Sequence, residues 1–468
     1  MKLSIIVSCA KSSLGHHWVI AYCDDVKPAV TSMQEFLLVD KAMSLFEMSS
    51  GCKMHRDPTS GKCKFLALGR WRGTLNQEDL PCNFFSLSDH LDMLGVTLKA
   101  TYIATRKVNG DELQERIKNV VGPWRSGKFM PLTMRPHSLN CYAFSKLWHK
   151  CTTTDLRVGD IMAINKQAKS WLYADLLEKP GELALYRHTS NGGLGLFNIQ
   201  LRALANLINS FLETACNPKF RRNQYHEALF NHHVLEHTPS INLDIPPYFK
   251  GDFFPAIKRI HASPLNVANI KVKDIYRFLI EEVTMEEDIS GIQTLQPLRV
   301  ELACPSNQWE QTWDMAMQSM LGPNLTTFLF KLLHLILPTG ERVARILPNQ
   351  SPTCTRCNDP TPAIDTLEHA MFGCSESQEA GAVLLTGLRK LLPTLTPAKI
   401  LTLNFNTTED LKFPITWSIG LFLSSLWQLR VAKKSIQLIR IRSDMEASCR
   451  LLRESRLEKT TEVLNLIF

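Results

Sequence analysis

Four side chains in the C-terminal third of the sequence have types and a spacing suited to binding a metal ion. They form a Cys-x-x-Cys pair, a histidine after eleven intervening residues and a cysteine after four more, namely Cys354, Cys357, His369 and Cys374. Such ligands suit tetrahedral zinc, with the first pair from a tight turn and the second from a helix start or its preceding loop. The alternative is chance, because the chain has 13 cysteines and 14 histidines. The spacing favours a zinc knuckle.

A pair of adjacent carboxylates near the N-terminus, Asp24 and Asp25, is the second candidate. A strand is expected at Trp18 to Tyr22 and an extended pattern resumes from Val26 to Val30, so the pair would lie at the tip of a tight hairpin. Two-metal phosphoryl transfer uses such carboxylates, provided that another strand supplies a further acidic group. The alternative is an ordinary turn, because aspartate favours such backbone positions.

Short strands and one helix are expected to position the carboxylates, and helices are expected around the cysteines. The N-terminal helix is expected from Gln34 to Met48, with Ser49-Ser50-Gly51 as its C-terminal stop. Further strands are expected at Phe65 to Leu68 and Asp92 to Leu98, and further helices at Gly110 to Val121, Arg157 to Leu177, Ile199 to Ala215, Trp309 to Leu321 and Thr326 to Leu337. The pattern predicts an α+β fold in which a small sheet precedes mostly α-helical regions.

The composition is that of a folded chain with a mild excess of positive charge. The 468 residues suggest roughly two to four domains. The formal net charge of +8 fits contact with a polyanion without requiring it. The basic residues that could contact phosphates are Arg221, Arg222, Arg430, Lys433, Lys434, Arg440 and Arg442. The alternative for the last five is the solvated face of an amphipathic helix.

Cysteine usage and the absence of long apolar runs indicate where the protein resides. The cysteines are odd in number and mostly scattered singly, which favours a reducing compartment. The apolar run Leu3 to Val7 is shorter than a signal-peptide core of roughly 7–15 residues. Polar residues interrupt Ile415 to Val431, the best candidate for a membrane span of roughly 20 residues. We therefore expect an intracellular protein, nuclear or cytoplasmic, that is neither secreted nor embedded in a membrane.

The residues around the carboxylate pair resemble a known signature. The segment Ala21–Val26 (Ala-Tyr-Cys-Asp-Asp-Val) resembles the Tyr-x-Asp-Asp motif of reverse transcriptases, which in LINE elements commonly reads Ala-Tyr-Ala-Asp-Asp. Ser50–Met54 looks like the Ser-Gly-x-Lys-x stretch of these enzymes, and Leu94-Gly95-Val96 resembles their primer-grip strand.

The cysteine region completes the resemblance. Leu333–Thr339 ahead of the cysteines and Thr366–His369 before Cys374 resemble the Cys-Cys-His-Cys region at the C-terminus of LINE reverse transcriptases. From about residue 18 onward, the chain thus resembles the C-terminal portion of a non-LTR (LINE-type) retrotransposon reverse transcriptase. His334 belongs to the approach to the knuckle, and we expect it to lie on an apolar face where a neighbour satisfies it.

The resemblance implies an RNA-directed DNA polymerase site in which Asp24 and Asp25 bind magnesium. It also implies that Lys62 or Lys64 protonates the departing pyrophosphate, with a solvated loop charge as the alternative for either lysine. Zinc in the knuckle, an RNA template and a DNA primer are implied as well. The implied regions are a partial reverse-transcriptase palm at 1–105, a helical thumb and post-thumb at 106–216, a linker-like region at 217–304 and a helical C-terminal domain with the zinc knuckle at 305–468.

The chain departs from the family at its front, where fingers and a first palm aspartate would precede the hairpin. Only 23 residues precede Asp24, and Met1 to Val19 contains no acidic residue. Two cations would then lack opposing ligands. We expect an N-terminally truncated reverse transcriptase fragment that is inactive alone and retains nucleic-acid binding. The alternatives are a zinc-dependent RNA- or DNA-binding module adopted by the host, and an enzyme that becomes active with a missing N-terminal polymerase segment.

Overall fold

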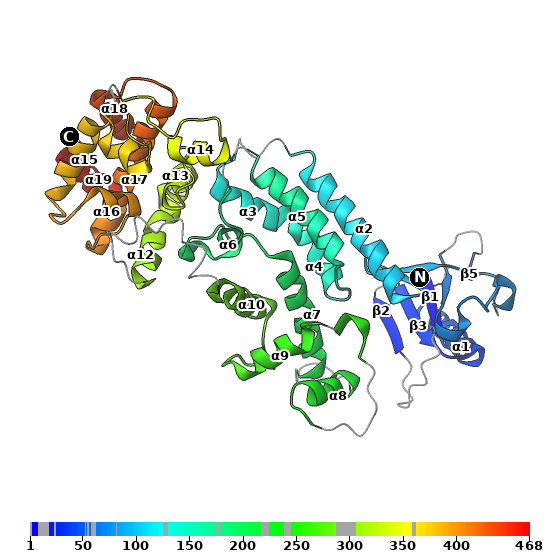
Figure 1. The fold of residues 1–468 in the computed structure, drawn as a ribbon. Helices are drawn as coiled ribbons and strands as arrows, with labels where there is room; N and C mark the ends of the chain where they lie inside the picture. The colour runs from blue at the N-terminus through cyan, green and yellow to red at the C-terminus, as the bar shows by residue number, and fades with distance from the viewer. Residues whose placement is uncertain are drawn as a thin grey trace. The chain divides into compact units, whose positions relative to one another are not determined.

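The computed structural model has the expected α+β fold, in which helices outnumber a few short strands (Figure 1). It describes residues 2–7, 18–22, 25–51, 53, 56–57, 62–80, 82–124, 130–174, 176–177, 179–216, 224–237, 245–249, 251–286, 306–357 and 362–468. The chain forms two compact units, and each is described by itself. The first comprises Met1–Lys118, Lys146–Ile164 and Ala203–Val272, and the second Asn119–Ser145, Asn165–Arg202 and Lys273–Phe468.

The six helices whose bounds the sequence pattern predicted all overlap described helices, namely α1, α2, α5, α7, α12 and α13. The helix expected at Ile199 to Ala215 has those bounds, and the expected N-terminal helix is one residue longer at its start and two at its end. The helices described are α1 Met33–Ser50, α2 Tyr102–Val121, α3 Arg135–Ser138, α4 Ser145–Cys151, α5 Val158–Leu172, α6 Glu182–Tyr186, α7 Ile199–Ala215, α8 Gln224–His233, α9 Phe253–Ala262, α10 Val272–Glu286, α12 Ser306–Ala316, α13 Pro323–Leu333, α14 Gly340–Ile346, α15 Gln378–Arg389, α16 Pro397–Thr402, α17 Glu409–Val431, α18 Leu438–Cys449 and α19 Glu454–Ile467.

The main sheet of the first unit joins five strands in the order β2-β3-β1-β4-β5. β2 and β3 pair antiparallel with Tyr22 opposite Asp25, which confirms the expected hairpin, whereas β1 runs parallel to β3 and β4. The sequence pattern did not indicate β1, because a central strand can read as a continuous apolar run without alternation. The strands are β1 Lys2–Val7, β2 Trp18–Tyr22, β3 Asp25–Val30, β4 Lys64–Ala67 and β5 Ser86–Leu87.

Helix α1 follows the hairpin and lies against the sheet (Figure 1). Ser32 caps its first turn through a side-chain hydrogen bond to a backbone N–H. Gly51 ends the helix in the left-handed conformation with a φ of 72°, which glycine adopts without steric cost. Phe36 of the helix packs edge-to-face on Phe65 of β4, with ring centroids 5.9 Å apart. The apolar face of α1 and the sheet therefore share one small core.

The strand expected over Asp92 to Leu98 is a hairpin of two strands, β6 His90–Met93 and β7 Val96–Lys99. The chain turns at Leu94 and Gly95, whose φ values of 49° and 81° are both in the left-handed region. Two consecutive left-handed residues form the tight turn that joins antiparallel strands with the natural twist. Periodicity alone missed this turn because leucine rarely adopts a positive φ.

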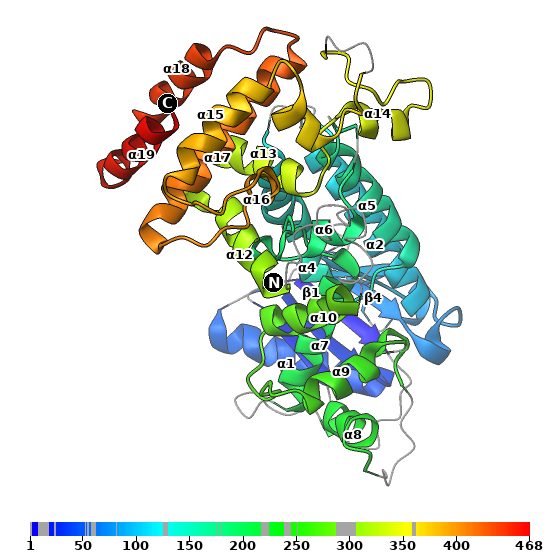
Figure 2. The ribbon, with the colours of Figure 1, turned by 60° about the vertical axis from the view of Figure 1, so that its left-hand side comes forward.

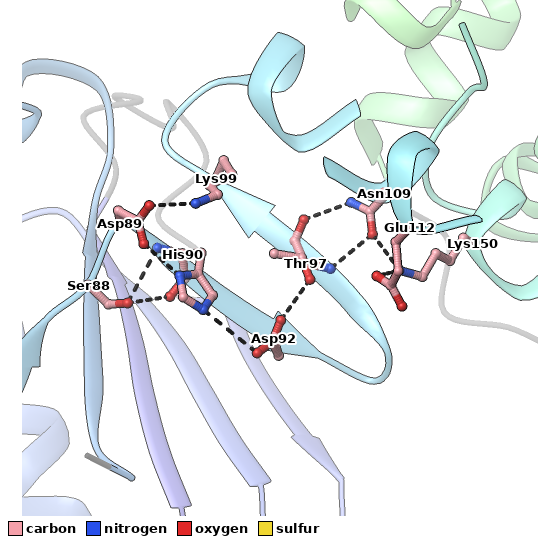
Figure 3. Close-up of polar contacts among 9 residues, drawn as sticks. All are labelled: Ser88, Asp89, His90, Asp92, Thr97, Lys99, Asn109, Glu112 and Lys150. Carbon is pink, nitrogen blue, oxygen red and sulfur yellow. Dashed lines mark hydrogen bonds and ion pairs between the residues drawn. The ribbon is translucent and has the colours of Figure 1, made fainter. Parts of the chain in front are cut away.

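A polar network attaches this hairpin to α2 and α4 (Figure 3). The Asn109 side-chain amide donates to the Thr97 carbonyl at 2.7 Å and accepts from the Thr97 N–H at 3.1 Å. Its oxygen also accepts from the Lys150 ammonium at 2.9 Å, and Lys150 pairs with Glu112. Lys150 is only 2% exposed, so these partners offset the cost of burying its charge. The network fixes β7, α2 and α4 relative to one another.

Gly110, which the sequence pattern placed at the start of a helix, lies in the interior of α2. The helix already begins at Tyr102, with the Thr101 side chain capping its first turn. Glycine is needed within the helix because a Cβ at this position would lie 2.2 Å from the carboxylate of Asp160. Asp160 is itself buried and hydrogen-bonded to Arg157, so it has little room to withdraw.

The region 217–304, expected to be linker-like, contains α8, α9 and α10 in its described residues. In the first unit, Phe211 of α7 contacts three phenylalanine rings edge-to-face at centroid distances of 5.1 to 5.8 Å, namely Phe249, Phe253 and Phe254. Pro255 falls in the first turn of α9. The backbone N–H groups of a first helical turn have no intrahelical partner, so proline is tolerated there.

In the second unit, α17 is the central element of a C-terminal helical cluster. It contacts α12, α13, α15, α18 and α19, and Figure 2 shows α15, α17 and α19 side by side. Buried side chains such as Trp417, Phe422 and Leu426 lie all around it, which is typical of a helix inside a core. Among the described residues, neither α17 nor any other helix has the length and apolarity needed to cross a membrane.

Replacing Gly110 with alanine should destabilise the first unit, because the new Cβ would displace the buried Asp160 carboxylate. We expect a loss of about 1–3 kcal/mol in the free energy of unfolding, measured by urea denaturation. Gly159→Ala is the matched control, because a Cβ there meets no atom within 4 Å and φ is not positive. Equal stability of the two variants would contradict the packing described for Gly110.

Candidate metal centre

The residues between α14 and α15 hold the predicted ligands, and we call residues 351–357 and 362–377 the metal loop. Its two arms are joined by an isolated β-bridge between Thr353 and Ile364. The Cys354 N–H donates to the Ala363 carbonyl at 2.8 Å, and the Asp365 N–H donates to the Pro352 carbonyl at 2.9 Å. These bonds bring the start of the loop beside its second half, where the remaining ligands lie.

The four predicted ligand atoms converge, all lying within 4.8 Å of one another. The Cys374 Sγ is 3.8 Å from the Sγ of Cys354 and 3.7 Å from that of Cys357, and the Cys357 Sγ is 3.2 Å from the His369 Nε2. Two sulfurs bound tetrahedrally to zinc at about 2.3 Å would be about 3.8 Å apart. A disulfide would instead require about 2.05 Å. The spacing-based prediction of this set is confirmed, and the set can hold a metal such as zinc.

A short π-helical segment, His369–Gly373, brings the last two ligands together. The Cys374 N–H donates to the His369 carbonyl at 2.7 Å, which closes the turn between them. A Cβ on Gly373 would lie 3.3 Å from the His369 Nδ1, so glycine leaves room for the imidazole ring. The Thr366 hydroxyl accepts from the His369 N–H at 3.1 Å and caps the segment. Sequence spacing alone does not reveal this π-helical turn.

Burial and crowding make the thiols electrostatically unequal. Cys354 and Cys374 are buried, while Cys357 and His369 are half-buried. Burial opposes ionisation of Cys354, yet hydrogen bonds, above all that from the Arg430 guanidinium, outweigh it and lower the pKa of this thiol to about 6. Burial, followed by the neighbouring thiols, raises the pKa of Cys357 to about 11. Several thiolates in this space therefore repel one another, and a coordinated cation would offset that repulsion.

Two arginines join the metal loop to the end of α17, and sequence reasoning did not assign this role to either. The Arg430 Nη2 donates to the Cys354 Sγ at 3.3 Å, and its guanidinium pairs with Asp365. Arg356 donates from its Nη1 to the Arg430 carbonyl at 3.0 Å and from its Nη2 to the Lys434 carbonyl at 2.8 Å. Because Arg430 is buried against the loop, it is not on the surface where a phosphate contact was expected.

The candidate polymerase residues are only partly within the described residues. Asp24 lies outside them, and for Asp25 the backbone alone is described, at the start of β3. Lys62 is exposed just before β4, and Lys64 is half-buried in the first position of that strand. In register, Lys2 of β1 stands opposite Asp25. The sequences of the five described strands of the main sheet contain one acidic residue, Asp25 itself.

His334 is satisfied by a neighbour, as expected, and lies apart from the ligand set. Its Nε2 donates to the Gly192 carbonyl at 2.8 Å, and its ring packs on Trp313 and Phe330. Gly192 has a φ of 74°, and a Cβ there would lie 2.3 Å from the Trp313 ring. Burial outweighs the hydrogen bond and lowers the pKa of His334 to about 4. The histidine therefore stays neutral and closes a packed junction within the second unit.

Most of the remaining candidate phosphate contacts are on the surface near the C-terminus. Lys433, Lys434 and Arg440 are exposed, while exposed Arg442 pairs with Glu446. Arg221 and Arg222 lie outside the described residues.

Comparison with known proteins adds no identification. The chain matches no protein-family model, and no curated protein matches it. The likeness to reverse transcriptases therefore stays a prediction that depends on the quoted motifs.

His334 should make the second unit less stable in acid. Its folded-state pKa is lowered from 6.5 to about 4, so its contribution is fully present above pH 6.5 and is lost as the pH falls toward 4. The difference corresponds to about 3 kcal/mol. His334→Gln, which has no titrating group, should flatten the pH dependence of the free energy of unfolding between pH 7 and 4. Identical pH profiles for both proteins would show that His334 is not buried neutral.

Proposed function

We propose that the chain is a zinc protein of the non-LTR reverse transcriptase type that binds RNA or DNA through its C-terminal region and does not polymerise by itself. The observation that carries the proposal is the Cys-Cys-His-Cys cluster attached to the end of α17, where an exposed basic stretch begins. The order of the sequence motifs supports the likeness to non-LTR reverse transcriptases. The Cys-Cys-His-Cys cluster and the basic stretch support the proposed nucleic-acid binding.

The donor set favours zinc over other common cations. Three thiols and an imidazole are soft or borderline ligands, and four such ligands suit the tetrahedral coordination that zinc prefers. Magnesium and calcium instead select oxygen ligands. Because the cluster is part of a closed loop with four protein ligands, its role is structural: the metal would hold the loop together and supply no open coordination position.

Residues 431–453, which we call the basic segment, offer a surface for a polyanion. They contain six Lys or Arg residues against two Asp or Glu residues. The exposed side chains of this segment include Lys433, Lys434, Arg440, Arg442, Arg450 and Arg453, together with the apolar Val431, Ile439 and Leu451. Positive groups interleaved with exposed apolar ones suit both phosphates and unstacked bases. Arg356 of the metal loop bonds the Lys434 carbonyl, so the metal loop positions the first two lysines.

The sheet favours binding over polymerisation by this chain. Two-metal phosphoryl transfer needs carboxylates that converge on both cations. The strands on either side of β3 have the sequences Trp-Val-Ile-Ala-Tyr and Lys-Leu-Ser-Ile-Ile-Val, and neither contains a carboxylate. Among the described residues, the strands paired with β3 therefore offer no acidic partner to Asp25.

Purified protein should release about one zinc ion per chain on denaturation, because one tetrahedral site is present among the described residues. Cys357→Ser should abolish the release, measured with a colorimetric chelator or by elemental analysis. Cys141→Ser is the control and should retain the zinc, because Cys141 is an exposed cysteine outside the cluster. Equal release by wild type and Cys357→Ser would remove Cys357 from the site.

The chain should bind single-stranded RNA or DNA with an affinity that falls steeply with salt. In Lys433→Ala/Lys434→Ala, the slope of log K against log salt should decrease by about 2, because two phosphate contacts are lost. The double variant Lys41→Ala/Lys273→Ala is the control: it removes the same charge from exposed positions outside the basic segment. Fluorescence anisotropy at several salt concentrations measures all three proteins.

Two outcomes would overturn the proposed function. If wild-type protein with zinc bound shows no salt-dependent binding to RNA or DNA, the chain is not a nucleic-acid-binding protein. If it extends a primer on a template in the presence of magnesium, the chain is a polymerase in its own right, and the missing carboxylate is supplied by residues outside the sheet.

A further inference from the structure

Arg430 carries a positive charge in a buried position, which is unfavourable without compensating partners. It lies in the last turn of α17, is 7% exposed and points into the metal loop. Taking a guanidinium out of water costs several kcal/mol unless its donors find partners. Its Nη2 has two such partners, the Sγ of Cys354 at 3.3 Å and the carboxylate of Asp365, whereas its buried Nη1 has no hydrogen-bond partner among the described residues. The arginine is therefore held by the metal loop itself.

Asp365 keeps the guanidinium in place. Its Oδ1 pairs with Arg430, and its Oδ2 accepts from the Gly340 N–H at 2.8 Å at the start of α14. Its own N–H is bonded to the Pro352 carbonyl at 2.9 Å, two residues before Cys354. Both carboxylate oxygens and the backbone are thus engaged, so the aspartate has little freedom. The donor aimed at Cys354 is oriented before any metal binds.

The charge of the Arg430–Asp365 pair sums to zero, so the pair adds no net charge to the site. What Arg430 does add is a charged N–H donor directed at a single ligand sulfur. Such bonds are stronger than neutral ones and draw electron density from the acceptor. Partners of this kind around metal sites orient the ligands and tune the metal, and their loss typically costs about 10–100-fold in metal affinity.

We propose that Arg430 is a positioning residue of the metal centre, whose N–H···S bond to Cys354 sets the affinity of the site for its metal and lowers the reactivity of the bound thiolate. This inference rests on the proposed zinc site. It makes the core helix α17 part of the site: the metal loop acquires its full affinity only when the C-terminal end of this helix is packed against it.

The contrasting possibility is that Arg430 only anchors α17 to the loop. An anchor would change the stability of the unit without changing the electronic state of the sulfur. Cobalt separates the two roles, because it occupies the same tetrahedral ligand set and shows a sulfur-to-metal charge-transfer band. Removing a hydrogen bond from a bound thiolate raises the energy of its electrons, so the band moves to longer wavelength.

The test uses the full chain as wild type, Arg430→Gln and Arg430→Lys. Three measurements are made: zinc affinity by competition with a chelator, the rate of zinc release on alkylation with N-ethylmaleimide, and the absorption spectrum of the cobalt form. For Arg430→Gln we expect about 10–100-fold weaker zinc binding, faster release and a charge-transfer band at longer wavelength. Arg430→Lys, which keeps a charged N–H donor, should recover part of each change.

Arg277→Gln is the matched control, because it removes the same charge from an exposed arginine on α10, outside the metal loop and the basic segment, and should match wild type in all three measurements. The proposal is overturned if Arg430→Gln keeps wild-type affinity, release rate and cobalt spectrum, even if its melting temperature falls. If Arg430→Gln does not fold, Asp365→Asn decides, since it releases the guanidinium from its anchor: an unchanged spectrum overturns the proposal. Wild type that binds neither zinc nor cobalt would refute the metal centre itself.

Discussion

Three thiols and an imidazole lie within 4.8 Å of one another, so a positive charge at their centre would stabilise the thiolate forms. Burial disfavours the thiolates of Cys354 and Cys357, and the neighbouring sulfurs raise the pKa of Cys357 further. A cation at the centre removes both penalties at once, because every ligand then faces a positive charge. The β-bridge, the π-helical turn and the glycine beside His369 all serve to keep these four atoms together.

The metal loop is not an independent module attached to the second unit. Arg430 reaches from α17 to Cys354, and Arg356 reaches back from the loop to the last carbonyls of that helix and the residues after it. Because α17 is buried by five other helices, the loop is linked to the core of the C-terminal cluster. The exposed basic segment starts at the same junction. Loss of the metal would therefore disturb the proposed nucleic-acid surface through the hydrogen bonds of Arg430 and Arg356.

The first unit contains the Asp-Asp motif on which the proposed likeness to reverse transcriptases depends. The β2–β3 hairpin has the antiparallel pairing that the Asp-Asp motif requires, and β6–β7 turns at the Leu-Gly pair that resembles a primer grip. A catalytic site also needs an acidic group from a second strand, and β1 beside β3 has a lysine in register with Asp25 instead. The described backbone thus forms a hairpin at the motif, and the strand paired with β3 has a lysine at that register.

The sequence by itself determined the ligand set, the hairpin at Asp25, six of the described helices and the role of His334 as a satisfied histidine outside the ligand set, because each depends on local spacing or on the character of a single side chain. Only the tertiary structure decided the position of Arg430, which looked like one of several surface cations until α17 packed against the metal loop. It also explained why a glycine, Gly110, lies within a helix: the carboxylate of Asp160, fifty residues away in the sequence, leaves no room for a Cβ. Contacts between distant segments do not affect the hydrophobic periodicity of the sequence. Their consequences can therefore be seen only in the packed structure.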